Sequence, residues 1–337
     1  MKAFIKAIEY YLPDAYLDNE RLAREVPGWT AEKIEAKTGI ACRRLAAPGE
    51  CSSDLAVAAA QKLFVSGACR PTDIDYLLLC TQSPDYFLPT TACLVQDRLG
   101  LPTTCGALDF NLGCSGFVYG LSLAKALIET GQARNVLLLT AETYSKFIHP
   151  GDRSVRALFG DGAAATIVSS IESDADYIGP FVFGTDGSGA NNLIVPTGGA
   201  RRAHDPSSPV TEDSDGNQRT ENNLYMNGPE IFAFTLRVIP QTTSRLLECA
   251  GLKIEEVDHW VLHQANRYML EHLRKKLRVP PEHFPILMAD CGNTVSSTIP
   301  IALCDLLAQG RLSRGQRLAL VGFGVGYSWA GGMVRWA

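Results

Sequence analysis

The sequence predicts an α/β protein built from two similar halves. Apolar runs that read as buried strands alternate with longer segments of helical period, the pattern of sheets covered by helices. Residues 74–82, which read IDYLLLCTQ, resemble residues 257–264, which read VDHWVLHQ. The segments that follow them also correspond, because Gly131 follows Cys114 by 17 residues and Gly310 follows Asn293 by 17. We therefore predict a duplicated unit.

The individual elements follow from the apolar pattern. Short apolar runs predict strands at 77–80, 136–139, 260–262 and 318–321. Longer segments with helical spacing predict helices at 55–66, 115–130, 231–250 and 297–309. In the second of these helices Gly116, Gly120 and Ala124 recur every four residues, which gives a flat stripe for close packing. We therefore expect that helix to be central and buried.

We expect one half at 1–175 and the other at 176–337. Within the second half, residues 185–223 are rich in Gly, Asp, Ser, Asn and Pro, which is turn chemistry with little to bury. This segment is interpreted as a surface excursion of the second half, and its length is typical of a functional or mobile loop.

Composition excludes several classes of protein. The 337 residues carry a net charge of -5, without the basic footprint that nucleic-acid binding needs. No apolar run approaches the roughly 18 residues of a membrane span, and no signal peptide is recognised, so a cytoplasmic protein without a membrane anchor is expected. The ten cysteines form no C-x-x-C pair. We expect most of them to be reduced and buried, with no metal site.

Cys114 is the candidate nucleophile. It lies in Gly113-Cys114-Ser115-Gly116, where a strand-like run ends and a helix begins. A helix N-terminus favours negative charge, so a lowered thiol pKa is expected there. The alternative is that Cys114 is a small buried core residue, the commoner role of a cysteine.

Two further residues are candidate partners of Cys114. His263 ends an apolar run, where a strand emerges and side chains reach a cleft, although such a histidine is more often structural. Asn293 occupies the position of Cys114 in the repeat, although Gly-Asn-Thr is also a common turn or helix cap. The glycine-rich stretch 322–326 fails the dinucleotide-binding register, and its backbone N–H groups are instead suited to an oxyanion hole.

Five motifs together resemble the β-ketoacyl-acyl-carrier-protein synthase III family. They are Lys37-Thr38-Gly39-Ile40, Phe159-Gly160-Asp161-Gly162-Ala163, His263-Gln264-Ala265-Asn266, Gly292-Asn293-Thr294 and Gly322-Phe323-Gly324. The resemblance covers nearly the whole chain. It implies a thiolase-like, duplicated, five-layered αβαβα fold, a homodimer and no permanently bound cofactor.

The resemblance also implies roles for residues. Cys114 looks like the acylated nucleophile, His263 and Asn293 look like donors to the malonyl thioester oxygen, and the backbone N–H groups of Cys114 and Val325 look like the oxyanion hole. The positions that match substrate contacts are Lys33, Phe87, Leu88, Arg153 and Asn266. Three departures from the family pattern bear on the substrate: Lys33 stands where tryptophan is common, Val325 where glycine is, and Leu88 where an aromatic residue often is.

The activity implied is a decarboxylating Claisen condensation of an acyl group from acyl-CoA with malonyl-acyl carrier protein, the reaction of a 3-oxoacyl-acyl-carrier-protein synthase III-like acyltransferase. The alternatives are a non-condensing acyltransferase and a non-catalytic partner subunit of a heterodimeric synthase. A basic run follows His263 and includes Arg267, Arg274 and Lys275. It is interpreted either as a docking site for the acidic carrier protein or as a solvated helix face.

Overall fold

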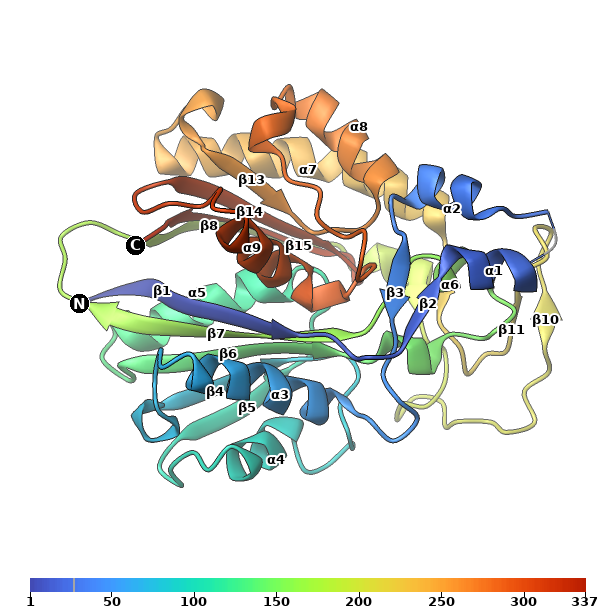
Figure 1. Ribbon diagram of the computed structural model, residues 1–337, viewed down its shortest axis with the longest axis horizontal. Helices are drawn as coiled ribbons and strands as arrows, with labels where there is room; N and C mark the ends of the chain where they lie inside the picture. Colours follow the sequence, from blue (N-terminus) through green and yellow to red (C-terminus); the bar gives the residue numbers. More distant parts are fainter. Residues whose placement is uncertain (27) are drawn as a thin grey trace.

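The computed structural model describes residues 1–26 and 28–337. Five layers stack in the order helices, sheet, helices, sheet, helices (Figure 1). The first sheet has the order β1 (Lys2–Tyr11), β7 (Gly162–Ile171), β6 (Asn135–Glu142), β4 (Tyr76–Cys80) and β5 (Gly106–Phe110). The second has the order β13 (His259–Leu262), β14 (Arg317–Gly324), β15 (Ser328–Arg335) and β8 (Ile178–Thr185). The five-layered αβαβα arrangement implied by the resemblance is confirmed.

The two sheets repeat one topology. β4 pairs with β6 in parallel, and β6 pairs with β7 and β7 with β1 antiparallel. In the same way β13 pairs with β14 in parallel, and β14 pairs with β15 and β15 with β8 antiparallel. The two similar stretches of sequence fall on β4 and β13, which occupy equivalent places. The division at residue 175 stays a prediction.

Helices form the three remaining layers (Figure 1). The helices α3 (Ser52–Val65) and α4 (Thr91–Arg98) cover the outer face of the first sheet, and α7 (Gly228–Ala250) and α8 (Arg267–Leu277) cover that of the second. Between the sheets lie α5 (Gly116–Glu129) and α9 (Thr298–Ala308), each of which contacts strands of both sheets. The helix at 115–130 is therefore central, as its small-residue stripe predicts. A Cβ on Gly120 would lie 2.5 Å from Cδ1 of Leu138, so β6 packs directly on the α5 backbone.

Apolar burial follows the layers. One buried cluster fills the space between the sheets, and two others lie under the outer helices. The four predicted strands fall in β4, β6, β13 and β14, and the four predicted helices match α3, α5, α7 and α9. Strands β1, β7, β8 and β15 lie outside the sequence-based prediction. The strand predicted at 260–262 begins one residue earlier, at His259.

Smaller elements gather at one end of the molecule, on the right in Figure 1. They are α1 (Asn19–Glu25), α2 (Ala31–Thr38), α6 (Arg153–Arg156), β2 (Tyr16–Asp18), β3 (Cys42–Arg44), β9 (Leu193–Ile194), β10 (Thr211–Glu212), β11 (Gln218–Arg219) and β12 (Tyr225–Met226). Short 3-10 helices span Pro71–Asp73, Tyr144–Phe147, Gly187–Asn192, Ile254–Glu256, Pro281–His283 and Val295–Ser297.

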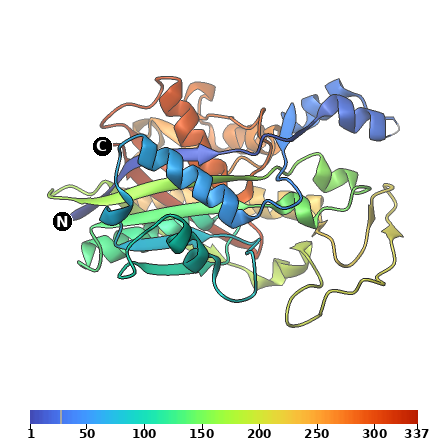
Figure 2. The same ribbon diagram turned by 60° about the horizontal axis from the view of Figure 1, so that its bottom comes forward.

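The excursion at 185–223 runs over the surface at this end (Figure 2). Most of its residues are exposed or half-buried, in agreement with the expectation that it has little to bury, although Leu193, Thr197 and Asn217 are buried. Arg219 also ties it to the rest of the chain through an ion pair with Asp152, 3.0 Å long, whose carboxylate is fully buried. The segment is therefore anchored at defined points.

All ten cysteines are free thiols. Four of them are buried, so the expectation that most are buried is wrong; these four are Cys69, Cys80, Cys114 and Cys291. In the part of the chain that the structure describes, none of the helices is both long and apolar enough to cross a membrane. The same residues hold no group of three or more His, Cys, Asp or Glu side chains placed to bind a metal ion.

Candidate active site

Cys114 lies in the turn between β5 and α5 and is 5% exposed. The end of β14 packs against this turn from the other sheet. A Cβ on Gly324 would lie 2.8 Å from Sγ of Cys114, and a Cβ on Gly113 would lie 2.8 Å from Cγ1 of Val325. The two glycines therefore leave room for the Cys114 and Val325 side chains where the cysteine turn meets the glycine-rich stretch.

Burial raises the pKa of the Cys114 thiol to about 12, and the nearby Glu142 carboxyl adds to that effect. Hydrogen bonding from the backbone N–H groups of Cys114 and Val325 lowers this pKa, but burial outweighs both. The expectation of a lowered pKa is therefore wrong, because desolvation exceeds the effect of the helix end. The same two N–H groups are the predicted oxyanion hole, and both favour negative charge on the sulfur.

His263 follows the last residue of β13 and is 2% exposed. Its Nδ1 lies 2.7 Å from Oγ1 of Thr298, and its ring stands edge-on to Phe323. Burial lowers the pKa of His263 to about 3, against an opposing hydrogen bond to the backbone of Val295. The ring is therefore neutral at physiological pH, so a single ring nitrogen carries a proton.

Hydrogen bonds of its backbone and of its side chain hold Asn293 in place. Its N–H donates to the Leu158 carbonyl at 2.9 Å, and its carbonyl accepts from the Gly160 N–H at 3.0 Å. Its Oδ1 accepts a hydrogen bond of 2.9 Å from the N–H of Val295. Because Oδ1 is occupied, the amide is oriented and its Nδ2 remains to donate elsewhere.

Val295 connects the three predicted catalytic residues. It belongs to the same apolar cluster as Cys114, its N–H bonds to Asn293, and its carbonyl lies 3.1 Å from the Thr298 hydroxyl and approaches His263. Its φ of 55° is in the left-handed region, which strains a β-branched side chain. The structure thus brings Cys114, His263 and Asn293 around one strained residue.

Glu142 at the end of β6 is a site residue that the sequence analysis missed. Its fully buried carboxyl accepts hydrogen bonds from the N–H of Gln82 (3.0 Å) and the hydroxyls of Ser83 (3.1 Å) and Ser296 (2.8 Å). Burial raises its pKa from 4.5 to about 8. The carboxyl therefore links the end of β4 to the segment that follows Asn293. Alternating polarity gives no sign of it, because β6 is buried along both faces.

The predicted substrate residues lie at varied places. Lys33 is exposed on α2, and Arg153 begins α6, half-buried beside Gly216 of the excursion. Asn266 caps α8, its side chain accepting from the N–H of Met269. Phe87 and Leu88 lie in the loop before α4 and are each 83% exposed, so this chain alone gives them little to pack against.

The predicted docking residues differ in exposure. Lys275 is exposed on α8, and Arg267 packs against Gly39. The Arg274 side chain is only 16% exposed and bonds to Glu271 and to the Val279 carbonyl. Arg274 is therefore occupied within the chain.

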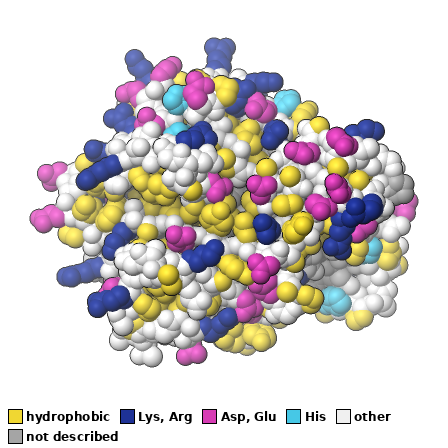
Figure 3. All heavy atoms as spheres, viewed as in Figure 1, with side chains coloured by type: hydrophobic (Ala, Val, Ile, Leu, Met, Phe, Trp, Pro, Cys, Tyr) yellow, Lys and Arg dark blue, Asp and Glu magenta, His cyan; other side chains and the backbone are white. Residues whose placement is uncertain are grey.

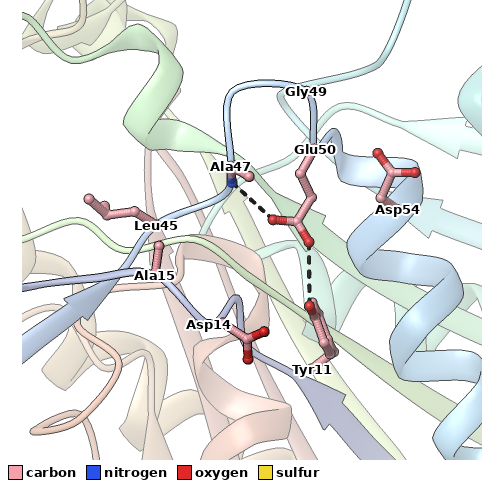
Figure 4. A pocket seen from close by; sticks show the side chains of 8 residues that line it. All are labelled: Tyr11, Asp14, Ala15, Leu45, Ala47, Gly49, Glu50 and Asp54. Carbon is pink, nitrogen blue, oxygen red and sulfur yellow. Dashed lines mark hydrogen bonds between the residues drawn. The ribbon is translucent and has the colours of Figure 1, made fainter.

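A hollow of about 600 Å³ opens elsewhere on the surface (Figure 4). Glu50 lies at its wall, accepting hydrogen bonds from the N–H of Ala47 and the hydroxyl of Tyr11. Asp14 and Asp54 also line it. None of the predicted catalytic residues lines this hollow, so its acidic side chains belong to a different part of the surface.

Two sheets of one topology around shared helices, with a cysteine turn in one half and a histidine and asparagine in the other, define a thiolase-like protein. The family described as 3-oxoacyl-[acyl-carrier-protein (ACP)] synthase III matches residues 108–187, and its C-terminal domain matches residues 247–336. The chain belongs to the β-ketoacyl-[acyl-carrier-protein] synthase III family.

Individual relatives match this chain over almost their full length. The β-ketoacyl-[acyl-carrier-protein] synthase III of Caldanaerobacter subterraneus subsp. tengcongensis is 37% identical over 97% of this chain and 96% of its own. That of Clostridium perfringens is 38% identical over 96% of each chain. A crystal structure of a 3-oxoacyl-(acyl-carrier-protein) synthase III is 57% identical, with a TM-score of 0.99 over the whole of both chains. The Thermus thermophilus enzyme superposes with a TM-score of 0.87 at 36% identity, covering 99% of each chain.

Proposed function

We propose that this chain condenses an acyl group from acyl-CoA with malonyl-acyl carrier protein, releasing carbon dioxide and forming a 3-oxoacyl-acyl carrier protein. The observation that carries the proposal is the surroundings of the Cys114 sulfur. The N–H groups of Cys114 and Val325 favour negative charge on it, Val325 and Gly324 pack against its turn, and Val295 links it to His263 and Asn293. Family membership and the names of the relatives support the same reaction.

In the first half-reaction Cys114 attacks the acyl-CoA thioester. The S–C bond to Cys114 forms, the S–C bond to coenzyme A breaks, and the thiol proton passes to the departing coenzyme A sulfur. Two backbone N–H groups in a buried site stabilise the tetrahedral oxyanion. The same N–H groups favour the Cys114 thiolate, which is the attacking species.

In the second half-reaction the malonyl unit loses carbon dioxide. The electron pair of the broken C–C bond passes into the thioester as an enolate, and the enolate carbon attacks the acyl group on Cys114. The Cys114 sulfur leaves and takes up one proton from water. Neutral donors on His263 and Asn293 stabilise the enolate oxygen without transferring a proton.

Two substitutions test this assignment. Cys114→Ala should abolish covalent acylation by acyl-CoA, measured by intact-protein mass spectrometry, while the exposed-thiol control Cys249→Ala keeps it. His263→Ala should retain acylation and lose condensation. Acylation of parent protein without carbon dioxide release from the malonyl substrate would favour the non-condensing acyltransferase, and no acylation would favour a non-catalytic subunit.

The partners belong to the same proposal. Acyl-CoA is a substrate contacted by Arg153, Lys33 and Asn266, and no cofactor is permanently bound. The exposed apolar tip formed by Tyr86, Phe87 and Leu88 supports a homodimer, because a second copy would cover it. A cytoplasmic location stays a prediction from the sequence.

Carrier docking is proposed on α8. Lysine and arginine side chains, interspersed with acidic ones, lie along the edge of the molecule where α7 and α8 run (Figure 3). Lys275 and Arg267 are exposed there, whereas Arg274 is paired within the chain. We assign docking to the exposed charges, because a paired and mostly covered guanidinium contributes little to steering.

A further inference from the structure

The hydroxyl of Thr298, the first residue of α9, has two possible acceptors. Its Oγ1 lies 2.7 Å from Nδ1 of His263 and 3.1 Å from the carbonyl oxygen of Val295. A hydroxyl has one proton, so it can donate to only one of them at a time. Thr298 is 3% exposed, so water competes little for this proton.

The direction in which the Thr298 hydroxyl donates determines which nitrogen of the neutral His263 ring is protonated. If the hydroxyl donates to Val295, Nδ1 must donate to Thr298, and Nε2 is left as a bare acceptor. If the hydroxyl donates to Nδ1, the ring proton is on Nε2, which then acts as a donor. The ring is neutral, so it cannot donate from both nitrogens.

We propose that Thr298 is a positioning residue that donates its hydroxyl proton to Nδ1 of His263 and so places the ring proton on Nε2. The inference rests on the proposed function, in which His263 must donate to the enolate oxygen. Two observations carry it. The contact to Nδ1 is the shorter of the two, and the Val295 carbonyl also lies within hydrogen-bonding reach of the ring.

The Thr298 hydroxyl matters because the nearby Val295 carbonyl competes with it for Nδ1 of His263. A carbonyl only accepts, so without the threonine hydroxyl Nδ1 would hold its proton and donate it to Val295. The acceptor would then face the substrate, and a bare nitrogen repels a developing oxyanion. Thr298 therefore prevents the Val295 carbonyl from selecting the unproductive tautomer.

Three variants test the proposal. Thr298→Val keeps the shape and removes the hydroxyl, Thr298→Ala removes it with less crowding, and Thr298→Ser keeps it. The tautomer is measured directly from the ¹⁵N shifts of the imidazole, and the spectrum of His263→Ala identifies the resonances. The expected result is an Nε2–H ring in the parent and in Thr298→Ser, and an Nδ1–H ring in Thr298→Val and Thr298→Ala.

The kinetic result should follow the tautomer. Losing one preorganised donor should lower the condensation rate about 10²- to 10³-fold in Thr298→Val, with acylation of Cys114 unchanged. An Nδ1–H ring in the parent, or an Nε2–H ring in both variants without the hydroxyl, would overturn the proposal whatever the rates. Failure of the proposed function is seen separately, as a His263→Ala variant that condenses at the parent rate.

Discussion

Gly324 at the end of β14 lies directly against the Cys114 side chain, so that a methyl group there would come 2.8 Å from the sulfur and 3.0 Å from Cβ. The second sheet thus sets the position of a nucleophile that the first sheet carries. Any side chain at this position must displace the sulfur or the strand.

Gly324→Ala should therefore suppress acylation of Cys114 while the protein still folds. The added carbon is closer than real Cβ contacts allow, and its neighbour is the fixed reacting group rather than a flexible chain end. The measurement is the rate of mass gain on incubation with acyl-CoA. Gly49→Ala is the matched control, because a Cβ there meets nothing within 4 Å. Equal rates for the two variants would contradict this account of the site.

Lys275→Glu should raise the KM for malonyl-acyl carrier protein about 2- to 5-fold. The effect is modest because an exposed charge contributes much less binding free energy than a buried, hydrogen-bonded ion pair does. The effect should shrink as salt is added and charges are screened. Acylation by acyl-CoA should not change. Arg134→Glu, an exposed arginine between α5 and β6, makes the same charge change in the other half. If both reversals act alike, general charge rather than docking on α8 is responsible.

Glu142→Gln should make the protein less sensitive to alkaline pH. The folded pKa is raised from 4.5 to about 8, so the folded chain keeps a proton that the unfolded chain loses between these values. This contribution to stability is complete below pH 4.5 and is lost as pH rises toward 8, by at most about 1.4 kcal/mol per pH unit.

Glutamine cannot ionise and still accepts from Gln82 and Ser83, so the unfolding free energy of Glu142→Gln should fall less than that of the parent between pH 5 and 8. Denaturant titrations across this range measure it. The exposed Glu282 provides the control Glu282→Gln. Parallel pH profiles for parent and Glu142→Gln would show that the carboxyl is ionised in the folded protein.

Arg219→Met should loosen the excursion at 185–223. The guanidinium pairs with Asp152 and Asp213, each at 3.0 Å, and Asp152 is fully buried. A buried carboxylate without its partner is destabilising by about 3–5 kcal/mol. Limited proteolysis within the excursion should accelerate. Arg202→Met removes a half-exposed ion pair with Glu221 in the same segment and should leave the cleavage rate unchanged.

Serine at both Phe87 and Leu88 should weaken a homodimer, because these side chains are the most exposed part of an apolar tip. Sedimentation velocity over a concentration series measures the shift toward monomer. Val65→Ser, at a single apolar residue that is 88% exposed, is the control. A parent protein that sediments as a monomer at all concentrations would contradict the proposed homodimer.

Much of the fold can be predicted from the sequence because β4, β6, β13 and β14 are continuous apolar runs. Other strands carry a different signal. β7 begins with Gly162 and three alanines, and β15 holds Gly331 and Gly332 at its centre. At Gly332 a Cβ would lie 2.8 Å from the Phe181 ring, so the strand needs glycine where neighbouring chains approach. Strand propensity is weak for such residues, and tertiary packing decides their structure.

The repeat predicted that Cys114 and Asn293 occupy equivalent positions, and the structure places both near Val295. The sequence could not predict the pKa of Cys114, because the depth of burial depends on how the two sheets close over the turn. It also could not find Thr298, whose importance depends on one hydroxyl proton. An unremarkable threonine in the first turn of a helix carries no such signal.

The helix layer shared by the two sheets places different constraints on the buried catalytic residues and on the exposed residues. Cys114 and Asn293 are fixed by α5 and α9, whose packing involves the core of both halves, so a change there disturbs the whole chain. Lys33 and Leu88 are exposed and outside that core. Exposed residues of this kind can therefore be exchanged without disturbing the packing around Cys114, so a difference in substrate contacts need not alter the core.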